Sequence, residues 1–379
     1  MLETKAETAS QHAASAVCPV NSWNEWDPLE EVIVGSLDYA TIPPHHVSVT
    51  FNADPMSRRL HGFAAGRRYP KFMVDAAQKN LDEFIQILKS QGITVRRPDA
   101  YDFQRNTKTP FWRSQGFCIA CPRDGFIVAG NDIVETPMGW RSRFFEGYAY
   151  RKLFQEYFDQ GARWSSAPKP MLLDSLYDEK FQAPKKGEPL RYVINESEVV
   201  FDAADFMRCG RDWFVQLSNV TNMQGVRWMQ RHLGDEIRIH VLETKCPDPM
   251  HIDTTFIPLA PGKVLVNPDY IDPRKLPPMF KNWDVIVAPT PDPIPSKGTL
   301  ADYALTHANM CSKWIALNVL SLDEKRIVVE RCQESMIRLL KEHGFEPIPC
   351  NFLYYSPFGG AFHCATLDIR RRGTLQSYF

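Results

Sequence analysis

The chain has 379 residues, of which 44% are apolar, enough to bury a continuous core in one large domain or two of ordinary size. Its 44 Lys and Arg nearly balance its 45 Asp and Glu, and the formal net charge is -1. This balance leaves no basic field to attract nucleic acid or an anionic membrane, so we expect a small-molecule substrate.

The first 18 residues are rich in Ala and Ser and lack both the apolar core and the Arg-rich pattern of a targeting signal. No stretch reaches the roughly 20 apolar residues that span a bilayer. The nine scattered cysteines, an odd number, argue against a disulfide framework. We therefore expect a cytoplasmic protein with a flexible segment at 1–18 and a single domain at 19–379.

Segments 116–130, 199–217, 251–268 and 317–331 each consist of two apolar runs around a polar turn, which predicts β-hairpins. Helical patterns at 71–91, 221–233 and 332–343 are each followed by a short strand, at 93–98, 237–243 and 346–350. The order hairpin, helix, strand recurs along the chain. It predicts one α/β domain of related modules, because each module must stack on its neighbours to bury its apolar face.

Cys118 and Cys121 have the spacing of a zinc-ligand pair. A structural zinc site needs two further ligands, and the sequence offers neither a second Cys-x-x-Cys nor a His-x-x-x-His. We predict two small residues on a buried strand and no metal.

Cys364 lies in the last predicted strand, FHCATLDIRR, after the pair Gly359 and Gly360. Glycines permit close backbone approach, which suits a nucleophile at a strand tip, although a free cysteine is more commonly a small buried hydrophobe. The neighbouring His363 would point to the opposite face of a strand, so a base must come from elsewhere. Asp368 lies about 13 Å along the strand, and we expect it to pair with an arginine of the adjacent RRRG segment.

Further candidates lie on the predicted hairpin arms. His251 and Asp253, two residues apart, would project from one strand face into one pocket, although a lone strand histidine is more commonly a satisfied core residue. Asp202 and Asp205 lie in an apolar arm, differ in parity, and should not both face the site. Asp124 precedes a glycine, as in an ordinary hairpin turn.

A thiol, an imidazole and several carboxylates together suit attack on a guanidinium group. Carboxylates clamp its N–H groups, a thiolate attacks its carbon, and a proton donor serves the departing amine. This chemistry requires no metal and no organic cofactor.

Long motifs run from about residue 18 to the C-terminus: NEWDPLEEVIVG, RRYPK, ITVRRPD, PMGWRSRFFE, APKP, FDAADF, MHID, SKW, NVLSLDEKR and FHCATLDIRRRGTLQSY. In these motifs the chain resembles the arginine-dependent amidinotransferases of the glycine and inosamine-phosphate types. The resemblance implies a pentein fold, a five-bladed α/β propeller of ββαβ modules with pseudo-fivefold symmetry. Homodimers are common in this family, and a homodimer is expected by analogy.

The resemblance also implies residue roles. Cys364, His251 and Asp202 match the catalytic residues, and Asp124 and Asp253 match those that bind the donor guanidinium. The implied reaction is ping-pong: the Cys364 thiolate takes the amidino group of L-arginine, His251 protonates the departing L-ornithine nitrogen, and an amine acceptor then attacks the same carbon. The positive charge of the bound guanidinium should favour the thiolate.

The remaining residues predicted for substrate binding are Met250 and four positions near the acceptor. Tyr270 stands where glycine amidinotransferases carry an Arg for a substrate carboxylate, Cys311 and Ser312 replace two serines, and Asp248 replaces an Asn. We therefore expect a larger, cationic acceptor without a carboxylate, paired with Asp248. Such acceptors fit bacterial and cyanobacterial enzymes of guanidino natural products of the saxitoxin type.

Three alternatives stay open at this point. Glycine as the acceptor would give guanidinoacetate. An arginine deiminase-like pentein hydrolase would admit water to the intermediate and release citrulline and ammonia. A non-catalytic arginine-binding protein would be expected to lose the nucleophile first, and Cys364 is present.

Overall fold

Five three-stranded sheets of the same internal order form the frame of this computed structural model, which describes residues 17–49, 55–103, 107–185, 187–296, 298–306 and 311–379. In each sheet the first strand is antiparallel to the second, and the second is parallel to the third. The sheets are β17(Thr366–Arg371)–β1(Leu29–Val34)–β2(Thr94–Arg96), β5(Phe126–Ala129)–β6(Asp132–Glu135)–β7(Arg163–Ser166), β8(Phe206–Cys209)–β9(Asp212–Val215)–β10(Arg238–Val241), β11(Phe256–Ala260)–β12(Lys263–Val266)–β13(Asp284–Val287) and β14(Leu320–Ser321)–β15(Arg326–Glu330)–β16(Glu346–Cys350).

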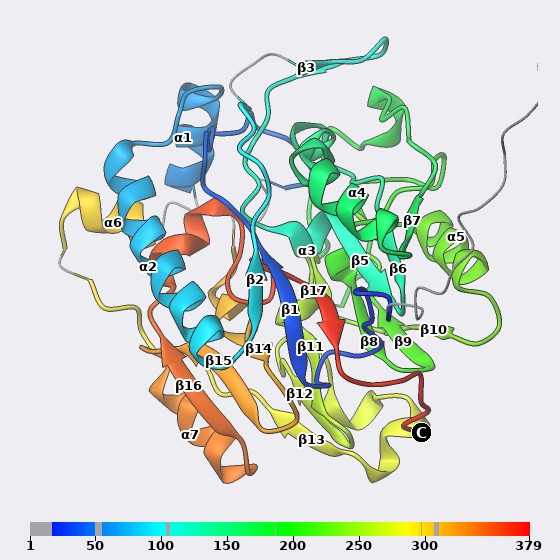
Figure 1. Cartoon of the computed structure of the whole chain (residues 1–379). Coiled ribbons are helices and arrows are strands. Elements are labelled where there is room, and N and C mark those ends of the chain that lie inside the picture. The colour runs from blue at the N-terminus through cyan, green and yellow to red at the C-terminus, as the bar shows by residue number, and fades with distance from the viewer. Residues whose placement is uncertain (1–16, 50–54, 104–106, 186, 297, 307–310) are drawn as a thin grey trace, which may run out of the picture.

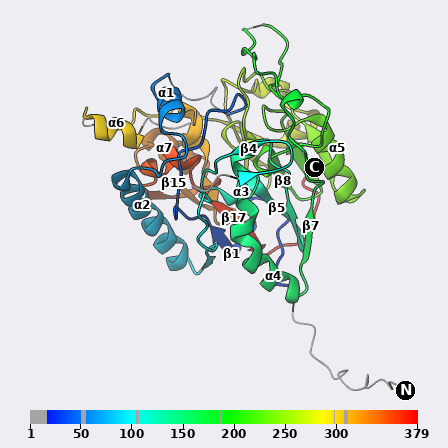
Figure 2. The same ribbon diagram turned by 90° about the horizontal axis from the view of Figure 1, so that it is seen from above.

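Helices join the second strand to the third, because parallel neighbours need a crossover connection. These helices lie at the periphery, outside the strands (Figures 1 and 2). In the fourth module two 3-10 turns replace the helix. The connections are α2(Lys71–Ser90), α4(Arg151–Asp159), α5(Met223–Leu233), α7(Glu334–Glu342), and η7(Pro273–Lys275) with η8(Pro278–Asn282).

The remaining elements are short. They are α1(Pro55–Ala64), α3(Pro122–Gly125), α6(Leu300–Thr306), the ribbon β3(Thr107–Lys108)–β4(Arg113–Ser114), and the 3-10 turns η2(Arg141–Arg143), η3(Glu146–Tyr150), η4(Asp174–Leu176), η5(Ala203–Asp205), η6(Ile252–Thr254), η9(Lys313–Leu317) and η10(Leu353–Phe358). Among the described residues, no helix combines the length and the apolar character needed to cross a membrane.

The two ends of the described chain meet in one sheet. Strand β17 pairs antiparallel with β1, with Val34 opposite Thr366 and Val32 opposite Asp368, and the two strands lie side by side in Figure 1. The C-terminal strand therefore supplies the first strand of the module that β1, α2 and β2 begin. Five modules of one design, closed in this way, form the predicted pentein fold, which is confirmed.

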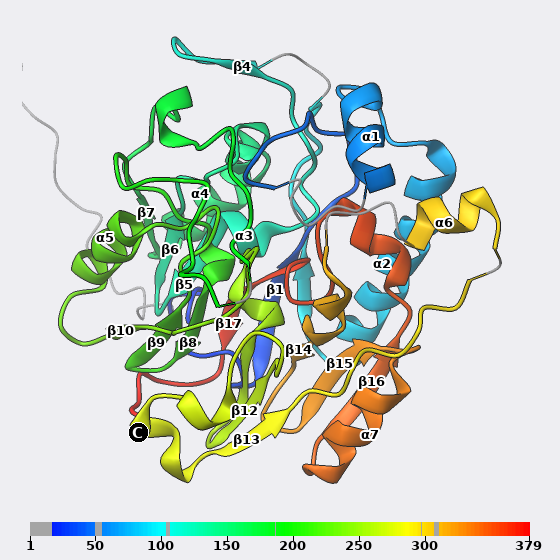
Figure 3. The same cartoon turned by 180° about the vertical axis from the view of Figure 1, so that it is seen from behind.

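A ring of turns lies where the modules meet. Each first strand is preceded by a short turn: α3 before β5, η5 before β8, η6 before β11, η9 before β14, and residues 362–365 before β17. Turn α3 contacts η5 and β17, η5 contacts η6, and η6 contacts η9. The repeated design therefore brings five turns, far apart in the sequence, to one centre, which the view from behind also shows (Figure 3).

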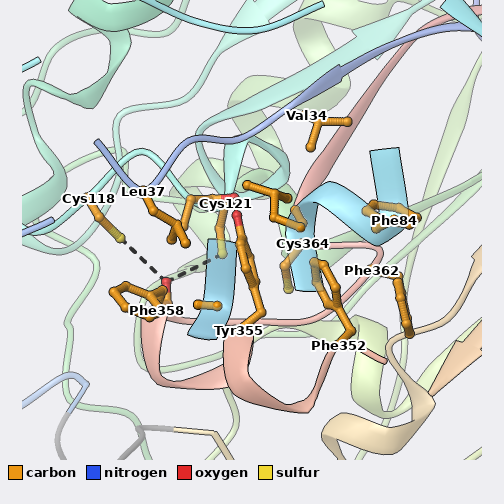
Figure 4. Close-up of a cluster of buried hydrophobic side chains, with 14 of the residues drawn as sticks. Val34, Leu37, Phe84, Cys118, Cys121, Phe352, Tyr355, Phe358, Phe362 and Cys364 are labelled. Atoms are coloured by element: carbon orange, nitrogen blue, oxygen red, sulfur yellow. Dashed lines mark hydrogen bonds between the residues drawn. The ribbon is translucent and has the colours of Figure 1, made fainter. Parts of the chain in front are cut away.

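The apolar core is divided between the modules. In the largest cluster, α2 packs against η10 through Phe84, which meets the rings of Phe352 and Phe362 at 5.1 and 5.2 Å (Figure 4). Each such buried ring contributes roughly 1.5–3 kcal/mol. Cys121 and Cys364 belong to the same cluster, so the central turns rest on packed hydrophobic side chains.

Most predicted elements are confirmed, including the helix at 71–91 and the hairpins of 199–217 and 317–331, although their strands are shorter than expected. The hairpin at 116–130 is wrong: the strands that pair are β5 and β6, and the chain turns at Gly130, whose φ is 60°. The expected turn forms α3 instead, because Pro122 fixes φ at a helical start. The division at residue 18 stays a prediction, and residues 1–16 lie outside the described residues.

Candidate active site

One cavity at the central ring holds every residue predicted for the site. Its lining includes Asp124 of α3, Asp202 before η5, His251 and Asp253 at η6, and Cys364 before β17. The predicted acceptor-side residues line it too: Asp248, Met250, Tyr270, Cys311 and Ser312. The module design thus gathers all ten in one place.

Cys364 lies in the turn that precedes β17, so the expected position within a strand is wrong by two residues. Its thiol donates to Asp253 Oδ2 at 3.3 Å, and its sulfur accepts from Asn318 Nδ2 at 3.2 Å. The predicted need for glycine is clear at Gly360, where a Cβ would lie 2.7 Å from the Cys364 sulfur. A hydrogen bond with Cys121, burial and the charges of nearby carboxylates raise the pKa of the Cys364 thiol well above its usual range, so the empty site holds a neutral thiol.

His251 lies between two carboxylates. Its Nε2 is 3.2 Å from Asp202 Oδ2 and its Nδ1 is 3.6 Å from Asp124 Oδ1. Burial opposes a charge on the imidazole, but Asp124 and Asp202 outweigh burial and raise the His251 pKa well above its usual range. The ring is therefore a proton donor near neutral pH, and it also hydrogen-bonds to Cys364.

The backbone at His251 differs from the predicted strand. His251 has φ of 58°, in the left-handed region, and η6 follows it; β11 begins only at Phe256. A non-glycine residue in this region carries strain of roughly 1–3 kcal/mol, which the surrounding structure must overcome. The turn, and not strand alternation, brings His251 and Asp253 into one cavity.

The two acids of FDAADF have different surroundings. Asp202 accepts from the Gly139 amide at 3.1 Å and faces His251, whereas Asp205 is bound by the hydroxyl groups of Ser218 and Thr221 and does not line the cavity. The expectation that only one of them faces the site agrees with this arrangement. The predicted extended arm is wrong, because η5 occupies this segment.

Asp124 and Asp253 each have one carboxylate oxygen that accepts no hydrogen bond from the described residues, although Asp124 Oδ1 is 3.6 Å from His251 Nδ1. Both residues are 1% exposed, and within the described chain neither Oδ1 atom has a hydrogen-bond donor. The other oxygen of Asp124 accepts from Arg143, and that of Asp253 faces His363 Nδ1 at 2.9 Å. A buried carboxylate oxygen without a donor is costly, so both atoms are suited to the N–H groups of a ligand.

The acceptor-side wall carries a third such carboxylate. Asp248 is half-buried, and its Oδ1 also has no donor among the residues that the structure describes. Tyr270 hydrogen-bonds to Ser312 and Cys246, and the Cys311 thiol donates to the Ser356 carbonyl. The wall beside Asp248 thus carries the neutral side chains of Tyr270, Cys311 and Ser312, and the Arg58 guanidinium lies close enough to oppose the rise that burial causes in the Asp248 pKa.

Three residues near the site were missed by the sequence reasoning. Arg143 binds Asp124 and is held by Glu146 at 2.9 Å; it lies in a motif that carried no assigned role. His363, which strand parity excluded as the base, contacts Asp253 and not the sulfur. Asn318 is a neutral amide in an apolar run, and its signal is its position two residues before the first strand of a module.

A candidate metal-holding group occurs in the site, apart from the Cys118 and Cys121 pair. Cys118 and Cys121 are buried beside the Phe358 carbonyl, but no metal-holding group of described residues includes them. The group with suitable atoms, within 4.8 Å of one another, is Asp124, His251 and Cys364. Because His251 is protonated between two carboxylates, it has no lone pair for a cation, and the group fits proton transfer and nucleophilic attack better.

Comparisons with known proteins agree with this arrangement, although no family model matches the chain. It is 48% identical over 360 residues to the L-arginine:L-lysine amidinotransferase of Pseudomonas savastanoi pv. phaseolicola, covering 95% of this chain and 96% of that protein. It is 45% identical to the mitochondrial glycine amidinotransferase of Gallus gallus, covering 99% and 88%. The solved structure of SxtG, an amidinotransferase from Microseira wollei in the saxitoxin biosynthetic pathway, superposes with a TM-score of 0.90 at 52% identity and covers 96% of this chain and 100% of that one.

These relatives are far above the similarity that fold alone would produce, and they span nearly the whole chain. The similarity first seen in the motifs therefore extends over nearly the whole chain. The chain belongs to the amidinotransferase family and is an enzyme of that family.

Proposed function

We propose that this enzyme transfers the amidino group of L-arginine, through a covalent adduct on Cys364, to an amine acceptor and releases L-ornithine. The observation that carries the proposal is a pair of carboxylate oxygens, on Asp124 and Asp253, that accept no hydrogen bond from the described residues and lie in the cavity that also holds the Cys364 thiol and the His251 imidazolium. A planar cation with several N–H donors satisfies both oxygens at once.

The first half-reaction follows from the protonation states. Bound guanidinium places a positive charge beside Cys364 and favours loss of the thiol proton to solvent, because His251 already carries its own proton; this charge offsets the carboxylates that oppose the thiolate. The sulfur attacks the guanidinium carbon, and the bond from that carbon to the ornithine nitrogen breaks. His251 gives its proton to the departing nitrogen, and Asp202 holds the ring in place.

The second half-reaction reverses the proton transfer. The acceptor amine enters the space that ornithine leaves, gives a proton to the now neutral His251, and attacks the amidino carbon. The carbon–sulfur bond breaks and Cys364 is restored. One residue thus serves as acid and then as base.

For the acceptor, we propose a cationic amine larger than glycine and without a carboxylate, of the kind used in saxitoxin-type guanidino toxin biosynthesis. The support is Asp248 Oδ1, which has no hydrogen-bond donor among the described residues, and the neutral side chains of Tyr270, Cys311 and Ser312 beside it. Among the described residues of the cavity lining the one arginine is Arg143, which is already bound by Asp124 and Glu146 and is not offered to a carboxylate. Glycine is the alternative, since a relative named for it is 45% identical. A homodimer and a cytoplasmic location stay predictions.

Mass spectrometry of the enzyme mixed with L-arginine alone tests the covalent step. We expect one amidino group on the peptide that contains Cys364, no adduct in Cys364→Ala, and an unchanged adduct in Cys209→Ala, a matched variant of a buried cysteine outside the cavity. A wild-type enzyme that forms no adduct, or that yields citrulline and ammonia in place of ornithine, would contradict the proposal.

An acceptor screen with L-arginine as the donor, followed by ornithine release, tests the second substrate. We expect turnover with polar amines larger than glycine and a lower kcat/KM for cationic acceptors in Asp248→Asn. Robust guanidinoacetate formation from glycine, with no turnover of larger amines, would overturn the acceptor assignment and leave the covalent step intact.

A further inference from the structure

Asn318 occupies the fifth position of the central ring. Four of the five turns before a first strand carry a residue of the proposed reaction: Asp124, Asp202, His251 and Cys364. The fifth turn, between η9 and β14, carries Asn318, whose side chain is buried and 2% exposed. The ring therefore places a neutral amide beside the nucleophile.

Both ends of the Asn318 amide contact Cys364. Its Oδ1 accepts from the Cys364 backbone amide at 3.1 Å, and its Nδ2 donates to the Cys364 sulfur at 3.2 Å. The backbone carbonyl of Asn318 also accepts a hydrogen bond from the backbone amide of His363 at 3.5 Å. Because Oδ1 is fixed by a backbone N–H, the amino end can only face the sulfur.

The other groups around the sulfur show why this donor matters. A hydrogen bond with Cys121 and burial raise the Cys364 pKa most, the charges of Asp253, whose Oδ2 is 3.3 Å from the sulfur, and of Asp124 raise it further, and His251 alone among these groups favours the thiolate. His251 changes its charge during each half-reaction of the proposed function. The Asn318 N–H does not titrate and stays on the sulfur throughout.

We propose that Asn318 is a positioning residue that orients Cys364 and stabilises the sulfur anion in both half-reactions. This inference rests on the proposed function. In the first half the thiolate forms the carbon–sulfur bond, and in the second half that bond breaks and returns its electron pair to sulfur. A hydrogen bond to sulfur therefore stabilises the reactant anion of the first step and the leaving anion of the second.

Two substitutions separate orientation from anion stabilisation. Asn318→Asp keeps the oxygen that binds the Cys364 amide but replaces the donor on sulfur with a carboxylate oxygen, whereas Asn318→Ala removes both contacts. If Asn318 only orients the turn, Asp should restore activity relative to Ala. If it stabilises the anion, Asp should be the poorer enzyme.

The measurement is the pH dependence of Cys364 alkylation by iodoacetamide, followed by mass spectrometry without substrate. We expect the midpoint to move to higher pH in Asn318→Ala and further in Asn318→Asp, with alkylation near neutral pH slowed about tenfold or more. The acid limb of kcat/KM for arginine should move in the same direction. Asn80→Asp is the matched control, because Asn80 is a buried amide whose Oδ1 accepts the Tyr354 amide outside the cavity; its alkylation profile should equal that of the wild type.

The inference would be overturned if the pH midpoint of Cys364 alkylation in Asn318→Ala equalled that of the wild type. It would also be overturned if Asn318→Asp were more active than Asn318→Ala. Thermal unfolding of each variant establishes that the folded protein is compared. Alkylation needs no turnover, so a missing arginine adduct in the wild type would refute the proposed function while the alkylation profile still reports on Asn318.

Discussion

Two groups of buried charge lie next to each other in this molecule and differ in one respect. In the first, here the paired cluster, Glu25 and Asp368 are bound by Arg123, Arg208 and Arg371. Both Asp368 oxygens accept from arginines, at 2.6 to 2.9 Å, and Arg208 binds both Glu25 oxygens at 2.7 and 2.9 Å. Every carboxylate oxygen in the paired cluster has a partner.

The second group, the site carboxylates, comprises Asp124, Asp248 and Asp253. Each leaves one oxygen without a donor among the described residues, and each faces the cavity. Burial is as deep for Asp124 and Asp253 as for the paired cluster. Asp27 Oδ2 and Asp132 Oδ1 are also buried without a donor but do not line the cavity, so a missing partner marks an acid that awaits a ligand where its oxygen also faces the cavity.

His363 joins the two groups. Its Nδ1 faces Asp253 at 2.9 Å and its Nε2 faces Glu25 at 3.4 Å. Burial and Arg123 oppose a charge on this ring, but the two carboxylates outweigh them and raise its pKa above the usual range. The paired cluster thereby holds one oxygen of Asp253 and leaves the other for the guanidinium.

The largest effect we expect comes from opening the paired cluster. Arg208→Met leaves Glu25 and Asp368 buried with fewer partners, and breaking a buried ion pair in this way costs about 3–5 kcal/mol. Urea unfolding should show this loss as a lower midpoint. Arg211→Met is the control, since its side chain is 43% exposed and its guanidinium pairs, among the described residues, with Glu236 and a carbonyl; it should change the midpoint little.

The site carboxylates should respond in the opposite way. Asp124→Asn removes a charge-assisted clamp, and we expect kcat/KM for arginine to fall about 100-fold, as for loss of a hydrogen bond between charged groups. Burial raises the pKa of Asp124, so its ionised form destabilises the fold at neutral pH and the variant should unfold at the same or a higher temperature. If Asp124→Asn lost stability but kept its kcat/KM, Asp124 would stabilise the fold and would not bind the substrate, contrary to our account. Asp212→Asn, a buried acid bound to His240 away from the cavity, should leave kcat/KM unchanged.

Acid should unfold the protein through the paired cluster. Burial disfavours the Asp368 charge, but Arg123, Arg371 and Arg208 outweigh burial and hold its pKa well below the usual value; Glu25 is lowered in the same way. A carboxyl with a depressed folded pKa contributes stability that is complete above its unfolded pKa of about 4 and is lost as the pH falls through the folded value. The unfolding temperature should therefore decline steeply below about pH 4, and less steeply in Asp368→Asn. Equal slopes for both proteins would contradict this account.

The sequence predicts the modules well because their signals are local. Alternating apolar runs around a turn predict the pairs β11–β12 and β14–β15, and the 3.6-residue period predicts α2. The closure of β17 onto β1 is a contact across the whole chain, and only the motif resemblance implied it. Local sequence patterns predict each module, but the arrangement of the modules around the ring could be predicted only from the family resemblance.

The site could be named from motifs but not built from strand parity. Alternation assumes extended backbone, whereas His251 has a positive φ and Cys364, Asp124 and Asp202 lie in or beside helical turns. The pairing of Asp368 with arginines was expected, and its Arg371 partner lies in the predicted RRRG segment; Arg123 and Arg208 come from other modules. Whether each oxygen of a carboxylate has a hydrogen-bond donor depends on residues from several modules. The sequence alone therefore cannot tell the paired cluster from the site carboxylates.

The smallest effect we expect comes from an ion pair at the surface, where solvent surrounds both side chains. Lys71 and Asp75 form an i,i+4 pair on α2 at 2.7 Å, with 85% and 53% of their side chains exposed. Water screens such a pair, so Lys71→Ala should change the free energy of unfolding by no more than about 0.5 kcal/mol, and by less in high salt. Urea unfolding at two salt concentrations measures this change beside that of Arg208→Met. If Lys71→Ala lowered the free energy of unfolding as much as Arg208→Met does, ion pairing in the buried interior would not be what stabilises the paired cluster.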